Sequence, residues 1–104
     1  MEHTDLKSMT QQNLPEDQQI VRLFFQRSEK AITYTRQKYG SLCISVARRI
    51  LSDPRDAEEC VNDTYLHAWN AIPPEKPDSL KAFLARITRN LALDRYDYNT
   101  ADQR

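Results

Sequence analysis

Glycine is nearly missing from this chain, which contains one glycine in 104 residues. Sheet proteins need glycines in their turns, and phosphate-binding loops and dinucleotide fingerprints need more than one. This composition therefore favours an all-α fold and excludes both motifs. A long apolar run is also absent, and the N-terminal segment MEHTDLKSMTQQNLPEDQQ has no hydrophobic signal region. We therefore expect a cytoplasmic protein without membrane contact.

Cysteine is scarce as well, and neither Cys43 nor Cys60 has a partner Cys or His at the short spacing of a zinc site. Both lie at apolar helix positions, so we expect two buried, reduced thiols. Glu58, Glu59 and Asp63 could hold a divalent metal, but a charged run of this kind is more typical of a solvated helix face. The sequence thus predicts no metal and no cofactor.

The formal net charge is zero, but the charges are sorted along the chain. Residues 27–51 carry six basic side chains against one acid, and residues 53–63 carry five acids against one base. Residues 80–95 are basic again, with four basic side chains against one acid. A basic surface can therefore coexist with an acidic one, and the zero net charge does not exclude a polyanionic partner.

Apolar spacing and capping residues predict four helices in one small domain. Residues 1–14 are polar and aperiodic and are expected to be disordered, residues 15–98 form the helical domain, and residues 99–104 are a second tail or the start of a linker. The expected helices cover residues 15–26, 29–51, 54–72 and 80–98. Asp53 followed by Pro54 is a strong start signal for the third helix, and the prolines of PPEKP end it.

The third expected helix has a second face that its packing does not require. Its apolar stripe includes Trp69, which predicts a core position for that ring. Steps of three and four residues place another set of side chains on the opposite side: Glu59, Asn62, Asp63 and Leu66. One stripe is enough to hold a helix in place, so a leucine among acids and amides is a candidate binding surface.

The last expected helix combines an inward stripe with an outward side that suits nucleic acid. Its expected core positions are Leu80, Leu84, Ile87, Leu91 and Tyr98. Away from that stripe lie Phe83, Arg86, Arg89, Asn90, Leu93 and Asp94. Arginine pairs with phosphates, aromatic rings stack on exposed bases, and amides read base edges. The same pattern also fits an ordinary solvated helix with one half-buried phenylalanine.

An enzymatic function is not expected. No Ser, His and acid fall in a plausible nucleophile arrangement, and the clustered acids lie on an exposed helix face rather than in a pocket.

Two motifs in order, DAEECVNDTYLHAWNAI and, after a proline-rich loop, LKAFLARITRNLALDRY, resemble region two of the extracytoplasmic-function group of bacterial RNA polymerase sigma factors. The resemblance spans roughly residues 18–96. It implies a transcription initiation factor domain that binds core RNA polymerase and recognises and melts the promoter −10 element. An anti-sigma factor is a further candidate partner.

The resemblance also implies a role for each surface. The third helix would dock on the clamp helices of the largest polymerase subunit through Glu59, Asn62, Asp63 and Leu66, a set that suits a basic partner. The last helix would hold the melted non-template strand, and the loop before it would accept a flipped-out base. The implied DNA-binding residues are Lys76, Ser79, Lys81, Phe83, Arg86, Arg89, Asn90, Asp94 and Arg95. We expect the four basic residues of this helix to lie along one side of it, and Phe83 to stand where the family usually has Trp.

One part of the family pattern is missing. Sigma factors of this group carry a helix-turn-helix domain that reads the −35 element, so we expect a truncated form, an incomplete gene product or a one-domain variant. Two other functions remain open. The chain could be a helical protein-interaction module without DNA binding, or a duplex-reading helix-turn-helix protein. The long, proline-rich loop before the last helix disfavours the second.

Overall fold

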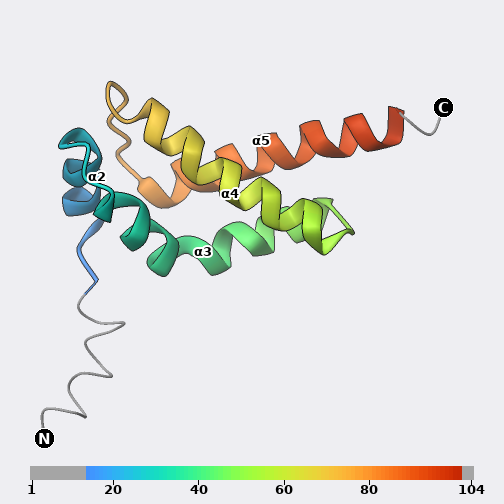
Figure 1. Ribbon diagram of the computed structural model, residues 1–104, viewed down its shortest axis with the longest axis horizontal. Helices are drawn as coiled ribbons and strands as arrows, with labels where there is room; N and C mark the ends of the chain where they lie inside the picture. Colours follow the sequence, from blue (N-terminus) through green and yellow to red (C-terminus); the bar gives the residue numbers. More distant parts are fainter. Residues whose placement is uncertain (1–13, 102–104) are drawn as a thin grey trace, which may run out of the picture.

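The computed structural model describes residues 14–101, which form four helices and contain no strand (Figure 1). The helices are α2 (Asp17–Phe25), α3 (Lys30–Ile50), α4 (Pro54–Ala71) and α5 (Leu80–Ala101). The predicted all-α fold is therefore confirmed. The tails expected at the two ends fall mostly on residues 1–13 and 102–104, which lie outside the described residues. None of the described helices combines the length and the hydropathy that crossing a membrane requires.

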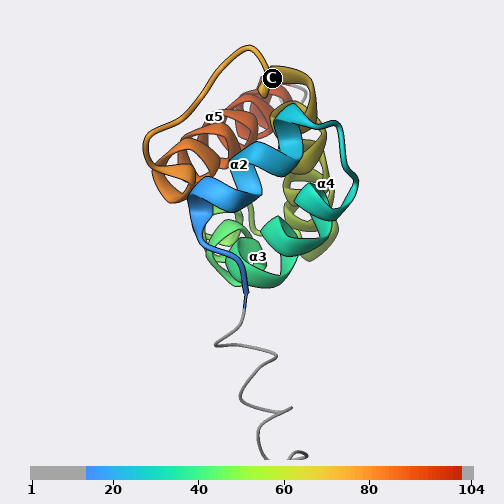
Figure 2. The ribbon, with the colours of Figure 1, turned by 90° about the vertical axis from the view of Figure 1, so that its left-hand side faces the viewer.

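The three long helices α3, α4 and α5 pack against one another, and α2 lies across one end of them (Figures 1 and 2). α2 contacts α3 along the chain and also reaches α4, because the rings of Phe24 and Trp69 lie with their centroids 6.3 Å apart. The loop of residues 72–79, which joins α4 to α5, crosses the same end of the molecule (Figure 2). α2 and this loop are therefore neighbours in space.

The starts of two helices follow the capping residues in the sequence. The carboxylate of Asp53 accepts the backbone N–H of Arg55 at 2.8 Å, and Pro54 occupies the first turn of α4. The hydroxyl of Ser79 accepts the backbone N–H of Ala82 at 3.1 Å at the start of α5. Both side chains satisfy a backbone donor that has no partner within the helix, so these boundaries were predictable.

The C-terminal end of α5 differs from the prediction. The helix continues to Ala101, past the expected end at Tyr98. The side-chain amide of Asn99 donates a hydrogen bond of 3.1 Å to Asp56 on α4, which ties this extra turn to the rest of the molecule. Tyr98 was expected to face inward, and this was wrong. It is 67% exposed, because it lies on the side of α5 that α4 does not cover here.

The core draws on all four helices. Its most deeply buried large side chains include Ile20, Phe24, Cys43, Ile72, Leu80 and Leu84. Cys43 and Cys60 are buried and free, as the sequence predicts, and burial raises the pKa of Cys60 to about 11. Trp69 packs against this core but stays partly exposed.

Phe83 is a second correction, because it was expected on the outward side of the last helix. The residue is only 6% exposed and belongs to the core. α5 packs against α3 and α4 together, and the loop of residues 72–79 passes beside its first turns. A helix with several neighbours buries more than one narrow stripe, which is why Phe83 is covered along with Leu84.

Candidate functional site

The outer face of α4 carries the exposed group that its spacing predicts. Leu66 is 56% exposed. The side chains around it are also exposed and point away from the core, so the structure brings the expected set together. We call it the α4 outer face: Glu59, Asn62, Asp63 and Leu66. The buried side of the same helix, which includes Cys60, Thr64 and Ala68, holds it in place.

Arg95 joins this acidic region rather than the basic one. Its guanidinium forms ion pairs of 3.0 Å with Asp56 and 2.8 Å with Glu59, and the hydrogen bond to Glu59 raises the pKa of Arg95. The expectation that Arg95 lies on one side of α5 with Arg86 and Arg89 was therefore wrong. The 3.6-residue period turns Arg95 to the side of α5 that faces α4.

The acids of α4 do not form a metal site. Among residues 14–101, no group of three or more His, Cys, Asp or Glu side chains is arranged to hold a metal ion. Glu59 is engaged with Arg95 instead.

A basic cleft lies between the end of α3 and the middle of α5. We call it the arginine cleft because it is lined by Arg49, Arg86 and Arg89. Its volume is about 360 Å³, and its remaining lining is apolar: Val46, Ile50 and Ala85. None of the three arginines forms an ion pair within the described part of the chain. Three uncompensated guanidinium groups around an apolar floor are suited to a phosphate-bearing ligand.

Arg49 is a residue of this cleft that sequence reasoning missed. It belongs to the basic run of residues 27–51, which was noted only as a charge pattern. The spacing within α3 gave no reason to group Arg49 with α5. Only the packing of α3 against α5 brings it next to Arg86 and Arg89.

The loop and the start of α5 form a second hollow, of about 350 Å³. Four of the residues expected to bind DNA line it: Lys76, Ser79, Phe83 and Arg86. Phe83 contributes from the core side, so little of its ring is available to a ligand. Arg86 lines both this loop hollow and the arginine cleft, so the two depressions adjoin at its side chain.

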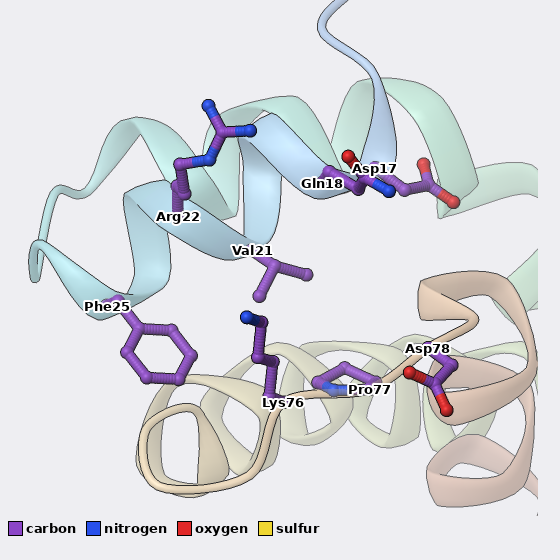
Figure 3. Close-up of a pocket in the computed structure, with 8 residues that line it drawn as sticks. All are labelled: Asp17, Gln18, Val21, Arg22, Phe25, Lys76, Pro77 and Asp78. Atoms are coloured by element: carbon purple, nitrogen blue, oxygen red, sulfur yellow. The ribbon is translucent and has the colours of Figure 1, made fainter.

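A third depression separates α2 from the loop, and we call it the α2–loop groove (Figure 3). It measures about 470 Å³ and is lined by Asp17, Gln18, Val21, Arg22, Phe25, Lys76, Pro77 and Asp78. The ammonium group of Lys76 points across the groove toward Val21, and the ring of Phe25 flanks it (Figure 3). The guanidinium of Arg22 points away from the loop (Figure 3). The loop therefore presents surfaces on two sides, one toward α2 and one toward α5.

The other expected DNA-binding residues lie apart from these depressions. Lys81, Asn90 and Asp94 are exposed on α5 and line none of the three. The structure therefore groups Lys76, Ser79, Arg86 and Arg89, and leaves these three side chains on open helix surface.

These surfaces belong to one helical domain, which has an acidic outer face on α4 and a basic cleft between α3 and α5. Residues 36–101 match the family model described as sigma-70 region 2. The match covers more than half of the 104-residue chain, and the chain belongs to this family. It is a region of a sigma factor, a non-enzymatic transcription initiation factor that binds core RNA polymerase and takes part in promoter recognition. No curated protein and no solved structure matches the chain significantly.

The matched segment begins within α3 and ends with α5. It includes the α4 outer face, the loop of residues 72–79 and the arginine cleft. It does not include α2 or the turn between α2 and α3.

Proposed function

We propose that the chain is region two of a sigma factor of the extracytoplasmic-function group and that it recognises the −10 element as a melted single strand. It would act in the cytoplasm, where core polymerase and promoter DNA meet, and an anti-sigma factor would be a further partner. The family supplies the polymerase and the promoter as partners. The finer assignments rest on the surfaces of the domain.

The α4 outer face is proposed to dock on the clamp helices of the largest polymerase subunit. An exposed leucine next to polar side chains can bury its apolar surface against a partner. The acids and the amide around it suit a basic partner surface and would steer its approach. We assign Arg95 to this side of the molecule as well, because it is paired with Glu59.

The loop and α5 are proposed to hold the −10 strand. The arginine cleft would bind phosphates and the loop would accept an extruded base, so affinity and base choice would come from different segments. The observation that carries this proposal is a cleft lined by three arginines without ion-pair partners, one of which, Arg86, also lines the loop hollow.

Fluorescence anisotropy can test the proposal with short −10 oligonucleotides, single-stranded and duplex, in the presence and absence of core polymerase. We expect preferential binding of the non-template single strand when polymerase is present. Replacing both Arg86 and Arg89 with Ala should weaken binding to all the oligonucleotides by a similar factor. The slope of log K against log salt should flatten by roughly 0.7 for each lost phosphate contact.

Substituting the loop residues 76–79 should change which base is preferred and leave the salt slope nearly unchanged. If the domain bound polymerase but no oligonucleotide, the alternative function, a helical protein-interaction module without DNA binding, would be correct. If it preferred duplex DNA without polymerase, a duplex-reading protein would be indicated instead.

A further inference from the structure

Arg27, in the turn between α2 and α3, reaches the far end of α4. Its Nη1 atom donates hydrogen bonds of 2.8 Å to the carbonyl oxygen of Trp69 and 2.9 Å to that of Ile72. Its guanidinium carbon also lies 3.8 Å from the centroid of the Trp69 ring. One side chain, distant in sequence, thus contacts the last turn of α4 in three ways.

These contacts lie where the loop of residues 72–79 begins. The last carbonyl groups of a helix have no partner within it, and the end of the helix carries a partial negative charge. A guanidinium at this position stabilises the end of the helix in two ways. It donates hydrogen bonds to the unpaired carbonyl groups, and its positive charge offsets the partial negative charge. Ile72 is the C-cap of α4, so the contact fixes the direction in which the chain leaves the helix. Lys76 follows within the same loop.

Arg27 is also joined to the opposite wall of the α2–loop groove. Phe25, the last residue of α2, lines that groove, and Gln26 caps the helix directly before Arg27. The other wall is made by loop residues 76–78. Arg27 comes just after α2, which forms one wall, and is hydrogen-bonded to the start of the loop that forms the other wall. It therefore sets the distance between the two walls.

We propose that Arg27 is a positioning residue for base recognition: it holds the loop of residues 72–79 against α2 and so sets the base preference of the domain without touching DNA. This inference rests on the proposed function. Arg27 lies outside the segment matched to the family, so the matched residues alone do not account for the shape of the loop.

The backbone conformation of Arg27 allows the role of its side chain to be tested separately from the shape of the turn. Its φ is 57°, in the left-handed region that favours glycine. Arg27→Gly removes the guanidinium without adding backbone strain, and Arg27→Lys, which adds no backbone freedom, shows how much of the effect belongs to the guanidinium contacts. Arg27→Lys keeps the positive charge but loses the planar donor group. Arg36→Ala is the matched control, since Arg36 lies over the ring of Tyr65, 5.1 Å from its centroid, and contacts no loop carbonyl.

The first measurement is amide hydrogen exchange of the free protein over residues 72–79, under conditions in which circular dichroism shows every variant folded. We expect Arg27→Gly to speed exchange in the loop by about tenfold, with a smaller effect for Arg27→Lys. The amide of Glu75, which donates to the carbonyl of Ala71 at 2.9 Å, is the most direct reporter. Arg36→Ala should leave loop exchange unchanged.

The second measurement is the ratio of affinities for single-stranded oligonucleotides that differ at the extruded base, with core polymerase present. Arg27→Gly should reduce this ratio by about threefold or more and leave the salt slope unchanged, because no phosphate contact is lost. Arg36→Ala should change neither quantity.

The possible outcomes distinguish a failure of the role proposed for Arg27 from a failure of the proposed function. Unchanged loop exchange in Arg27→Gly overturns the inference, as does faster exchange with an unchanged base ratio. A wild-type domain that binds polymerase but shows no base preference contradicts the proposed function, and the positioning of the loop is then decided by exchange alone. If Arg27→Gly does not fold, Arg27→Lys decides the same comparison.

Discussion

The ring of Phe83 lines the loop hollow from the core side, and the residue is 6% exposed. A base that stacked on this ring would have to displace the packing around it. In many single-strand binders an exposed aromatic serves as the stacking platform. The burial of Phe83 therefore favours a packing role and is consistent with the proposal that Arg86 and Arg89 supply the affinity through contacts to DNA phosphates.

Substitution of Phe83 tests this distinction. Phe83→Ala should lower the free energy of unfolding by about 3–5 kcal/mol, because it removes a buried aromatic ring. Phe83→Leu should cost less than about 1.5 kcal/mol and leave DNA affinity unchanged. Denaturant unfolding and anisotropy measure the two quantities. If Phe83→Leu folded normally but lost about 1–3 kcal/mol of oligonucleotide binding, the ring would be a stacking platform after all.

Asp63 tests the α4 outer face. Asp63→Arg should leave the fold intact, because the side chain is exposed, and should weaken binding to core polymerase by about 1 kcal/mol or more through charge reversal. Asp97→Arg, on the exposed surface of α5, changes the net charge equally and serves as the control. Equal capture of polymerase by both variants in a quantitative pull-down would remove Asp63 from the interface.

Three buried threonines lie within the packed helices, and they differ in how their hydroxyl groups are satisfied. The hydroxyl oxygens of Thr64 and Thr88 lie 2.9 Å apart across the α4–α5 contact, so one of the two hydroxyls donates to the other. The hydroxyl that accepts this bond can donate to the carbonyl one turn earlier in its own helix, which lies at 2.9 Å in both cases. Thr35 on α3 is equally buried, but its hydroxyl has no partner. A buried polar group without a partner destabilises the folded state.

Thr35→Val should therefore stabilise the domain. The substitution keeps the shape of the side chain and removes the unsatisfied hydroxyl, which should add about 1 kcal/mol to the free energy of unfolding. The melting temperature should rise by roughly 4–8 °C for a domain of this size. Thr64→Val is the matched control and should lower stability by about 0.5–1.5 kcal/mol, because its hydroxyl is bonded. A lower melting temperature for Thr35→Val would contradict the assignment.

α2 is held to α3 by a polar contact as well as by apolar packing. The carboxylate of Asp17 accepts hydrogen bonds from the Tyr39 hydroxyl at 2.9 and 2.7 Å and forms an ion pair of 2.7 Å with Lys38. Burial, reinforced by Asp17, raises the pKa of Tyr39 to about 12. The pKa of a tyrosine in an unfolded chain is about 10, so folding favours the protonated hydroxyl.

The sign of this shift predicts a loss of stability in alkali. Because the folded pKa of Tyr39 lies above the unfolded one, its contribution is complete below about pH 10 and declines as the pH rises toward about 12. Tyr39→Phe should be less stable than the wild type at pH 8, and the difference should shrink at pH 11. Urea unfolding at the two pH values measures it. A constant difference would show that Tyr39 titrates as it does in the unfolded chain.

The ends of the helices differ in how well they could be predicted from the sequence. The start of α4 was predictable because Asp53 and Pro54 act locally on the first turn. The end of α5 was not, because its last turn is held by Asn99 bonding to a residue of another helix. The alignment of Arg95 with Arg86 and Arg89 was wrong on spacing alone, because the helical period places Arg95 on the opposite side of α5 from Arg86. The outward position of Phe83 failed for a reason related to that of the α5 end. Helical spacing gives the order of side chains around an axis, but neighbouring elements decide which side is covered.

Charge in the whole molecule is divided between helices while the sum stays at zero. The acidic side belongs to α4 and the arginine cleft to α3 and α5. Arg95 connects the two regions, because it lies on α5 but pairs with Asp56 and Glu59 of α4. It therefore neutralises part of the face proposed to meet the polymerase rather than adding to the cleft.

Arg95→Ala and Arg89→Ala should accordingly affect binding to different partners. Without Arg95 the α4 side gains net negative charge, so association with a basic polymerase surface should become faster and more sensitive to salt. DNA affinity and its salt slope should remain those of the wild type. Loss of the half-exposed ion pairs should lower stability by no more than about 1 kcal/mol.

Arg89→Ala should instead weaken oligonucleotide binding, flatten its salt slope and leave polymerase association unchanged. Association rates measured at several salt concentrations, together with anisotropy on single-stranded −10 oligonucleotides, compare the two variants directly. Because each removes one positive charge from α5, the net charge cannot explain a difference between them. If Arg95→Ala weakened DNA binding as much as Arg89→Ala, Arg95 would have to leave Glu59 when DNA binds, and it would act on DNA together with Arg89.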